Sequence, residues 1–255
     1  MGELAALPAG PVARAAIAAF VKAYGVDLSE AIVPRGGFRT FDEFFTRELK
    51  PGARPVEGDN DTLVSPADGR IEDFGPVDER STFLVKGKPY TAEELLGGEE
   101  SRYAGGQFFI VYLSPRDYHR VHAPVGGPVR RLRYVPGTLY PVNRIGLDYV
   151  DGLFARNERV VITQSSDFGD VTTVMVGAIG VGRISVVFDD VVTNMGQSPG
   201  LRDYGENGPP IDRGEQLGLF HLGSTAIVFV GPDHPIAFRI EGQRHVRVGE
   251  AVGTR

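Results

Sequence analysis

The first fifty residues carry apolar side chains at helical spacing. Between residues 11 and 24, apolar side chains recur at every fourth position, at Val12, Ala16, Phe20 and Tyr24. Side chains four residues apart lie on one face of a helix, so this stretch is predicted to be helical. Pro11 fits the first turn, and Gly25 ends the helix.

A second, shorter helix is predicted over residues 40–49. Thr40 is followed three positions later by Glu43, the spacing of a capping box at a helix N-terminus. An aromatic stripe follows, at Phe41, Phe44 and Phe45. Core packing is the usual explanation for such a stripe, and a surface that faces lipid is the alternative. Residues 1–50 are therefore expected to form a small helical element that is a possible membrane-contact region.

After residue 55 the chain changes to short apolar runs separated by turn residues, which is typical of strands. Strands are predicted at residues 62–64, 70–74, 107–113, 129–134, 159–164, 171–181, 183–188, 225–230 and 236–240. Gly180 and Gly182 are expected to mark a tight turn or bulge, and residues 193–213 an exposed loop. The predicted fold class is α+β and predominantly β, with a strand-rich sandwich or barrel-like core in a β-rich domain over residues 51–255.

The overall composition narrows the class of protein. The chain has 255 residues, enough to bury a sizeable core, and its net charge of -6 argues against a nucleic-acid partner. It has no cysteine, so disulfides, thiolate nucleophiles and cysteine metal sites are excluded. The apolar run at residues 15–21 is too short to span a bilayer and lacks a signal-peptide layout. Any membrane contact is therefore expected to be peripheral.

Three polar segments interrupt the predicted strands, at residues 65–69, 113–122 and 223–225. In the first, Asp68 precedes a glycine, an arrangement that is most often structural. The second holds His119 and His122, whose side chains point to opposite faces of a strand and meet at one site only if the segment turns. In the third, Ser224 directly follows a glycine. Attack of its hydroxyl on the carbonyl of Gly223 would cut the chain at that bond.

Asp68, His122 and Ser224 together supply the carboxylate, imidazole and hydroxyl of a nucleophilic triad. In such a triad the histidine removes the serine proton, and the aspartate fixes the histidine tautomer. Their chain order, Asp–His–Ser, is that of subtilisin. The sequence has no G-x-S-x-G elbow, which argues against an ordinary α/β-hydrolase.

These motifs in combination resemble the phosphatidylserine decarboxylase proenzymes. The resemblance extends from about Phe20 to about Gly231. It rests on FVK with Tyr24 and Val-Asp (residues 20–27), FDEFFTR (41–47), PADG (66–69), LSPRDYHRVH (113–122) and LGST (222–225). Residues 134–143, YVPGTLYPVN, also resemble a glycine-containing active-site loop of that family.

The resemblance implies a self-processing enzyme. In the family, the residues that match Asp68, His122 and Ser224 drive self-cleavage between Gly223 and Ser224, which gives a β chain of residues 1–223 and an α chain of residues 224–255. Ser224 becomes a pyruvoyl group, which forms a Schiff base with the substrate amine and accepts the electrons released as CO2 leaves. His119 is then expected to return a proton to the substrate α-carbon.

The resemblance also implies the substrate and the setting. The expected reaction converts phosphatidylserine to phosphatidylethanolamine and CO2. The expected partners are this phospholipid, the cytoplasmic side of the cell membrane as a peripheral contact, and the α chain paired with the β chain of the same precursor. A homo-oligomer is expected, and no metal.

Two alternatives remain open from the sequence. The short N-terminal region motivates a pyruvoyl-dependent decarboxylase of a soluble amino acid. The other alternative is a β domain that is not cleaved, in which the two histidines of residues 113–122 hold zinc with Asp68 or Asp117, or carry a phosphoryl group. His221, just before the LGST motif, adds a second imidazole near Ser224, so the identity of the base also stays open.

Overall fold

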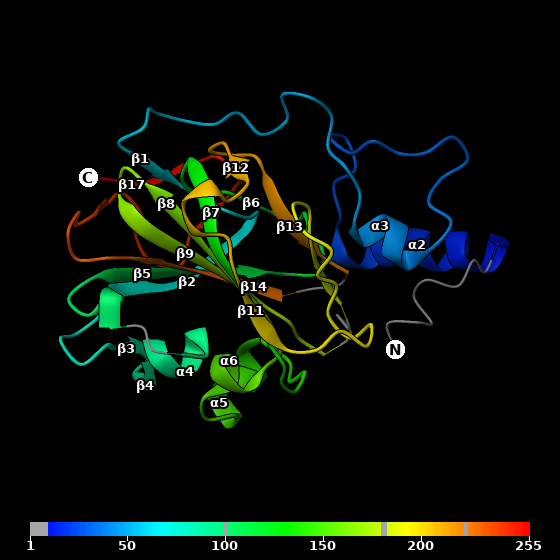
Figure 1. The fold of residues 1–255 in the computed structure, drawn as a ribbon. Coiled ribbons are helices and arrows are strands. Elements are labelled where there is room, and N and C mark those ends of the chain that lie inside the picture. The colour runs from blue at the N-terminus through cyan, green and yellow to red at the C-terminus, as the bar shows by residue number, and fades with distance from the viewer. Residues whose placement is uncertain (1–9, 99–100, 180–182, 222–223) are drawn as a thin grey trace.

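The N-terminal element consists of two helices at one end of the molecule. The computed structural model describes residues 10–98, 101–179, 183–221 and 224–255. Helix α2 (Gly10–Tyr24) confirms the first predicted helix, and α3 (Phe41–Phe45) follows it beside the strand-rich body (Figure 1). Phe44 and Phe45 are fully buried in a small cluster with Ile17 of α2, so this part of the aromatic stripe packs a core.

Helix α3 is shorter than the sequence predicts. Thr40 caps it as expected, because its hydroxyl accepts the Glu43 N–H at 3.0 Å. The Glu43 carboxylate reaches back to the N–H of Arg39 instead of that of Thr40. The helix ends at Phe45 because the next residues pair elsewhere: the carbonyl of Glu48 accepts the N–H of Ile32, and residue 49 forms a bridge with residue 31.

A large antiparallel sheet forms the centre of the body. Its strands lie in the order β11-β7-β8-β9-β14-β5-β2-β16, with β12 paired to β7. Their bounds are β2 (Gly69–Pro76), β5 (Gln107–Leu113), β7 (Gly127–Val135), β8 (Arg159–Ser166), β9 (Gly169–Val176), β11 (Gly200–Asp203), β12 (Pro210–Ile211), β14 (Ser224–Val230) and β16 (His245–Val246). Every residue of β14 is buried, and β14 pairs with β5 on one side and β9 on the other. The continuous apolar run over residues 226–230 suits a strand covered on both faces.

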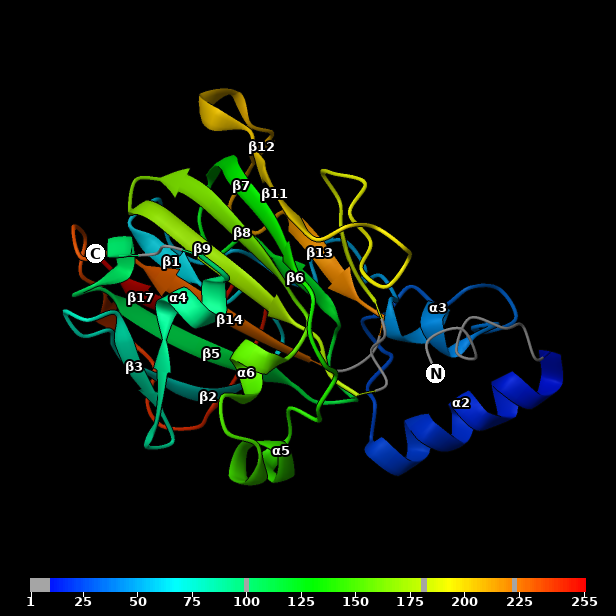
Figure 2. The ribbon, with the colours of Figure 1, turned by 60° about the horizontal axis from the view of Figure 1, so that its bottom comes forward.

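Smaller sheets and short helices complete the body (Figure 2). One sheet has the order β10 (Ile184–Val186), β13 (Gln216–Phe220), β6 (Arg120–His122), and another the order β1 (Thr62–Val64), β17 (Ala251–Thr254), β15 (Ala237–Phe238). A hairpin joins β3 (Thr82–Val85) to β4 (Lys88–Thr91). The short helices are η1 (Ser101–Tyr103), α4 (Ala92–Leu96), α5 (Arg144–Tyr149), α6 (Leu153–Arg156) and η2 (Gly205–Asn207). This architecture confirms the predicted α+β, predominantly β fold class.

Several predicted strand limits are wrong, each for a local reason. The strand predicted over residues 171–181 ends at Val176, because the side chain of Asn157 takes the Gly177 carbonyl. The strands predicted over 183–188 and 236–240 shorten to β10 and β15. The loop predicted over 193–213 contains β11 and β12, whose backbones pair with β7 although β11 is wholly exposed. The turn expected at Gly180 and Gly182 lies outside the described residues.

The chain changes sheets close to the predicted cleavage point. Strand β13 belongs to the small sheet and ends at Phe220, and β14 begins in the large sheet at Ser224. In Figure 2, β13 runs toward the end of the molecule that carries α2 and α3. Its neighbour β6 ends with His122, which lies opposite Gln216, the first residue of β13. At the other end of β13, which leads toward Ser224, the N–H of Phe220 donates to the carbonyl of His119.

Candidate active site

Ser224 occupies the first position of β14, opposite Leu113 of β5. Its side chain is fully buried, and its hydroxyl oxygen has no hydrogen-bond partner among the described residues. A buried polar atom without a partner is destabilising and uncommon. The hydroxyl of the next residue, Thr225, is in the same state. The Ser224 hydroxyl is therefore held in the interior, and no described residue uses its hydrogen-bonding capacity.

His119 presents one free ring nitrogen in a buried environment. Its Nδ1 lies 2.8 Å from the carbonyl oxygen of Asp117, and since a carbonyl only accepts, Nδ1 carries the proton. Its Nε2 is buried and has no partner in the part of the chain that is described. Burial lowers the pKa of His119 to about 4, with the charge on Arg47 acting in the same direction. The ring is therefore neutral at pH 7, with a free lone pair on Nε2.

A tight turn before His119 places this ring. The Asp117 carboxylate accepts hydrogen bonds from the Ser114 N–H at 2.7 Å and from the Ser114 hydroxyl at 2.6 Å. Its other oxygen lies 3.1 Å from Nε2 of His245, on β16. Burial alone would raise the pKa of Asp117, but these bonds from His245 and Ser114 outweigh it and keep the pKa below its usual value. The sequence predicts that the segment before the two histidines turns. An ionised, buried carboxylate, that of Asp117, holds this turn.

His122 points its ring into a second polar contact. Its Nδ1 lies 2.8 Å from the carbonyl oxygen of Gly214, and its Nε2 accepts from the Tyr118 hydroxyl at 3.3 Å. Burial lowers the pKa of His122, against the opposing effects of the Gly214 carbonyl and the charge on Asp68. Burial also raises the pKa of Tyr118 to about 12, so the phenol keeps its proton. His122 is therefore a neutral imidazole whose basic nitrogen is Nε2.

Asp68 is engaged by an arginine that the sequence analysis did not single out. Arg54 donates through Nε to Oδ1 at 2.9 Å and through Nη2 to Oδ2 at 2.5 Å. The backbone N–H of Val248 donates to Oδ1 at 2.8 Å. All three predicted triad members are described, and no hydrogen bond joins Asp68 to His122 or His122 to Ser224. The structure thus brings Asp68 and His122 near enough for the charge of one to act on the other, without direct contact.

Comparison with known proteins decides the family. The family model described as phosphatidylserine decarboxylase matches residues 41–254. The chain belongs to the phosphatidylserine decarboxylase family. Among curated relatives, a phosphatidylserine decarboxylase proenzyme of Brevibacillus brevis is 40% identical over 260 residues, which cover 100% of this chain and 92% of the relative. One of Shewanella halifaxensis is 40% identical over 261 residues, which cover 98% and 91%. The resemblance drawn from the motifs is confirmed.

A cavity of about 220 Å³ lies where the N-terminal element of this family member meets its strand-rich body. Asp68, Asp117 and Tyr118 line it, so it adjoins the partners of both histidines. Arg47, from the FDEFFTR motif, also lines it and is buried; it donates to the carbonyls of Arg116 and Asp117 at 3.0 Å each. Arg47 therefore supports the turn that carries His119.

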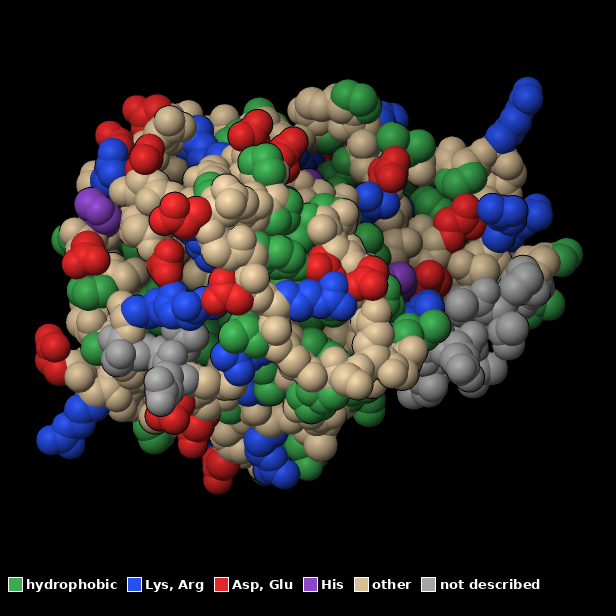
Figure 3. Space-filling model, in the orientation of Figure 1, with side chains coloured by type: hydrophobic (Ala, Val, Ile, Leu, Met, Phe, Trp, Pro, Cys, Tyr) green, Lys and Arg blue, Asp and Glu red, His purple; other side chains and the backbone are tan. Residues whose placement is uncertain are grey.

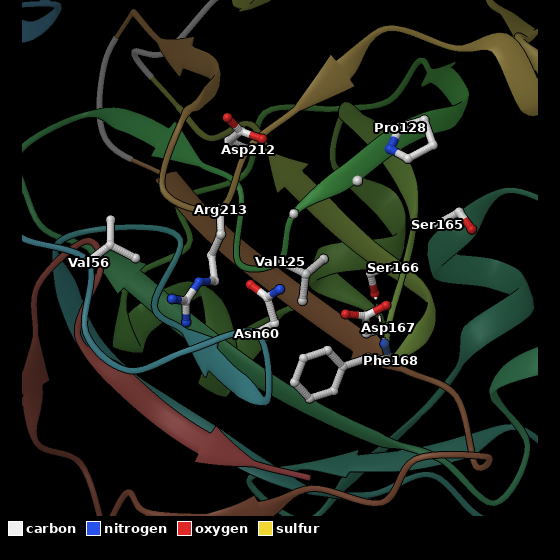
Figure 4. A pocket seen from close by; sticks show the side chains of 12 residues that line it. Val56, Asn60, Val125, Pro128, Ser165, Ser166, Asp167, Phe168, Asp212 and Arg213 are labelled. Carbon is white, nitrogen blue, oxygen red and sulfur yellow. Dashed lines mark hydrogen bonds between the residues drawn. The ribbon is translucent and has the colours of Figure 1, made fainter.

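A larger cavity, of about 720 Å³, lies elsewhere (Figure 4). It is lined by polar residues such as Asp167, Asp212 and Arg213, and includes none of the predicted site residues. The Arg213 guanidinium donates to three backbone carbonyls, those of residues 57, 58 and 62. This cavity is thus separate from the candidate active site of the decarboxylase fold.

The described residues hold neither a metal-ligand cluster nor a helix suited to a membrane span. Within the described ranges, no three His, Asp or Glu side chains gather as a metal site. The zinc alternative thus has no ligand set in that part of the chain. None of the helices in the described ranges has the length and apolar character needed to cross a bilayer.

Proposed function

We propose that this chain is a self-processing, pyruvoyl-dependent decarboxylase that converts phosphatidylserine to phosphatidylethanolamine and CO2. The observation that carries the proposal is Ser224: the serine of the LGST motif has a fully buried hydroxyl, with no partner among the described residues, at the start of the central strand. Family membership supplies the reaction class, and the named relatives are phosphatidylserine decarboxylase proenzymes.

Self-cleavage begins at the Ser224 hydroxyl. Its oxygen attacks the carbonyl carbon of Gly223, and the peptide bond becomes an ester as the amide nitrogen takes up a proton. Elimination across Cα and Cβ of Ser224 then breaks the ester and releases residues 1–223 with a free carboxylate. The dehydroalanine left on residues 224–255 takes up water and loses ammonia, which gives the pyruvoyl group. The chemistry needs a base for the hydroxyl proton and for the Cα proton lost in the elimination, and it needs no external oxidant.

His122 is the base in this proposal, and Asp68 is its partner. Because burial keeps the pKa of His122 below its usual value, the ring is in the basic form at neutral pH. For the triad to form, the Nδ1–H of His122 exchanges the Gly214 carbonyl for the Asp68 carboxylate. Arg54 must loosen its hold on Asp68 in the same step. The proposal thus includes a local rearrangement around Asp68 before the bond is cut.

The buried position of Ser224, whose hydroxyl has no partner among the described residues, fits a pyruvoyl group. A ketone has no hydrogen to donate, so it leaves no buried donor without an acceptor, and the pairing of β14 holds the group in place. When formed, the group withdraws electrons from the bond that loses CO2. His119 serves this step from Nε2. Its neutral ring takes up the proton that the substrate ammonium gives off, and later delivers a proton to the substrate α-carbon.

The N-terminal element is the proposed membrane contact. Val12 and Tyr24 of α2 are 73% and 51% exposed, and Ile32 and Val33 in the following loop 45% and 46%. In Figure 3, basic side chains lie beside hydrophobic ones at this end of the molecule, with acidic side chains among them. Exposed apolar side chains with cations nearby suit the surface of an anionic bilayer. We place the protein at the cytoplasmic face of the cell membrane as a peripheral homo-oligomer, and the two processed chains remain paired.

Release of CO2 from defined substrates tests the proposal. Wild type should release CO2 from phosphatidylserine vesicles and release far less from free serine, whereas Ser224→Ala should release none from either. Thr225→Val is a matched control, since this neighbour is also buried and the change replaces its hydroxyl with a methyl group of nearly the same size. Turnover of free amino acid alone would replace the phospholipid with the soluble substrate, and activity in Ser224→Ala would contradict the cofactor assignment.

A further inference from the structure

His221 forms a close contact with the N-terminal element. Its Nδ1 lies 2.6 Å from Oδ1 of Asp42, on α3. The two side chains are 16% and 23% exposed. In sequence, His221 stands three residues before Ser224 and directly after β13. A residue of the N-terminal element is thus joined to the chain just before the proposed cleavage point.

The contact is part of a small polar cluster. The other oxygen of Asp42 lies 3.7 Å from the Arg183 guanidinium, and Nε2 of His221 lies 3.3 Å from the Ser185 hydroxyl. The backbone N–H of His221 donates to the carbonyl of Arg183 at 3.2 Å. His221 is therefore held at three atoms, and the Asp42 bond is the shortest of the three.

We propose that Asp42 is a positioning residue for self-processing, so that the rate of chain cleavage depends on the N-terminal element being docked. This inference rests on the proposed cleavage at Ser224. Downstream of the bond, β14 fixes Ser224 by pairing on both sides. Upstream, β13 ends at Phe220, and the side chain of His221 is held from α3. Attack by a hydroxyl requires its target carbonyl within a few tenths of an ångström of one place, so a loosened upstream end slows the reaction.

Docking of α3 does not itself depend on Asp42. Phe44 and Phe45 are buried in the N-terminal cluster, and the Phe45 ring packs against His119 at 5.2 Å between centroids. Arg120 of β6 donates to the carbonyl of Thr46, at the end of α3, at 2.8 Å. Removing the Asp42 charge should therefore leave the helix in place and loosen only His221.

The test measures the rate at which freshly made precursor divides into two chains. Asp42→Asn and His221→Gln should each slow division on the order of tenfold, about 1.4 kcal/mol in activation free energy. Asp42→Glu should restore most of the rate. The double variant should be no slower than the slower single variant, because both remove one interaction. Once processed, Asp42→Asn should release CO2 within about twofold of wild type, since the cut bond no longer needs positioning.

Glu43→Gln is the matched control, because it removes the same charge from the same helical turn and, among the described residues, its carboxylate bonds only to Arg39. If Glu43→Gln slows division as much as Asp42→Asn does, the N-terminal element is loosened as a whole and the inference is overturned. The same follows if processed Asp42→Asn loses as much CO2 release as it loses in rate of division. Normal division of Asp42→Asn would also overturn it while leaving the proposed function intact. If Asp42→Asn fails to fold, His221→Gln decides by the same criterion. A wild-type chain that never divides would instead refute the proposed function.

Discussion

At the scale of single residues, the candidate site depends on which nitrogen of each histidine is free. In both His119 and His122, Nδ1 lies 2.8 Å from a backbone carbonyl, which leaves Nε2 as the basic atom. Burial lowers the pKa of both rings. The two histidines are thus prepared as proton acceptors, and they differ in their surroundings: Nε2 of His122 has the Tyr118 hydroxyl as partner, and that of His119 has none in the described structure.

This difference predicts separate roles that one substitution can resolve. His119→Ala should leave division of the chain nearly unchanged, because His122 serves that step. It should lower CO2 release by roughly 10²-fold or more, the usual effect of losing a general acid–base group. Gel analysis of processing and release of CO2 from vesicles measure the two effects on one preparation. A variant that fails to divide, or one with full turnover, would contradict the assignment of His119.

The burial of His119 also predicts a loss of stability in acid. Its pKa is about 4 in the folded chain against an ordinary 6.5, so between these values the unfolded chain binds more protons. The free energy of unfolding should therefore fall as pH drops from about 6.5 toward about 4, and the contribution should be fully present above that window. Urea unfolding at several pH values measures it, in a Ser224→Ala background that keeps one chain.

The control for this titration is His119→Gln in the same background. Its unfolding free energy should decline less over the same window, because glutamine takes up no proton. Identical slopes in the two proteins would show that His119 does not control the acid dependence.

Residue types and motifs were enough to select Ser224, Asp68 and the two histidines from the sequence, but not their partners. Arg54 lies 14 residues before Asp68, and the carbonyl that holds His122 belongs to Gly214, 92 residues away. His245, which holds the turn before His119, has no motif around it. Such contacts are set by how the sheets pack, and no local pattern encodes them. The assignment of the triad itself stays a prediction.

At the scale of elements, apolar runs predicted the long central strands and three short ones, β1, β10 and β15, and missed the other short strands. Strands β5 and β14 match the predicted runs closely, because both are buried through most of their length. Strands β6, β13 and β16 are short or flanked by polar residues, and their pairing is set by neighbours distant in sequence. The apolar pattern therefore did not predict the pairing of β6 with β13, although this pairing positions His122.

The central position of β14 predicts a large effect of truncating its core side chains. Ile227 is fully buried and pairs with both neighbouring strands. Ile227→Ala should lower the free energy of unfolding by about 2–5 kcal/mol, through lost burial and an unfilled cavity. Urea unfolding in the Ser224→Ala background measures this change. Leu84→Ala, at a side chain that is 58% exposed, is the control and should change it by about 0.5 kcal/mol or less. Equal effects would contradict the central placement of β14.

At the scale of the whole molecule, the N-terminal element lies beside the body and near the predicted site. Its own small core is separate from the main core, and the cavity lined by Asp68 and Asp117 lies at the junction. The expected domain boundary near residue 50, between the helical element and the β-rich domain, stays a prediction. The arrangement would let one end of the molecule contact lipid while the strand-rich body holds the reacting groups.

A charge on the exposed face of α2 should separate lipid binding from processing. Val12→Asp should weaken sedimentation with anionic vesicles about tenfold. The change replaces an exposed apolar side chain that would insert into the lipid with a negative charge that anionic lipid repels. CO2 release from the same vesicles should fall in parallel, and division of the chain should not change. Leu84→Asp, on the hairpin β3–β4, is the control and should bind as wild type does. Equal weakening in both variants would contradict α2 as the lipid contact.

The mass of the small chain tests the central claim most directly. If Ser224 becomes the ketone, intact-mass measurement of purified wild type should find two polypeptides, residues 1–223 and residues 224–255, with the second lighter by one ammonia than its sequence requires. Ser224→Ala should give one full-length mass. A single full-length wild-type mass, or a small chain that keeps its serine nitrogen, would contradict the account.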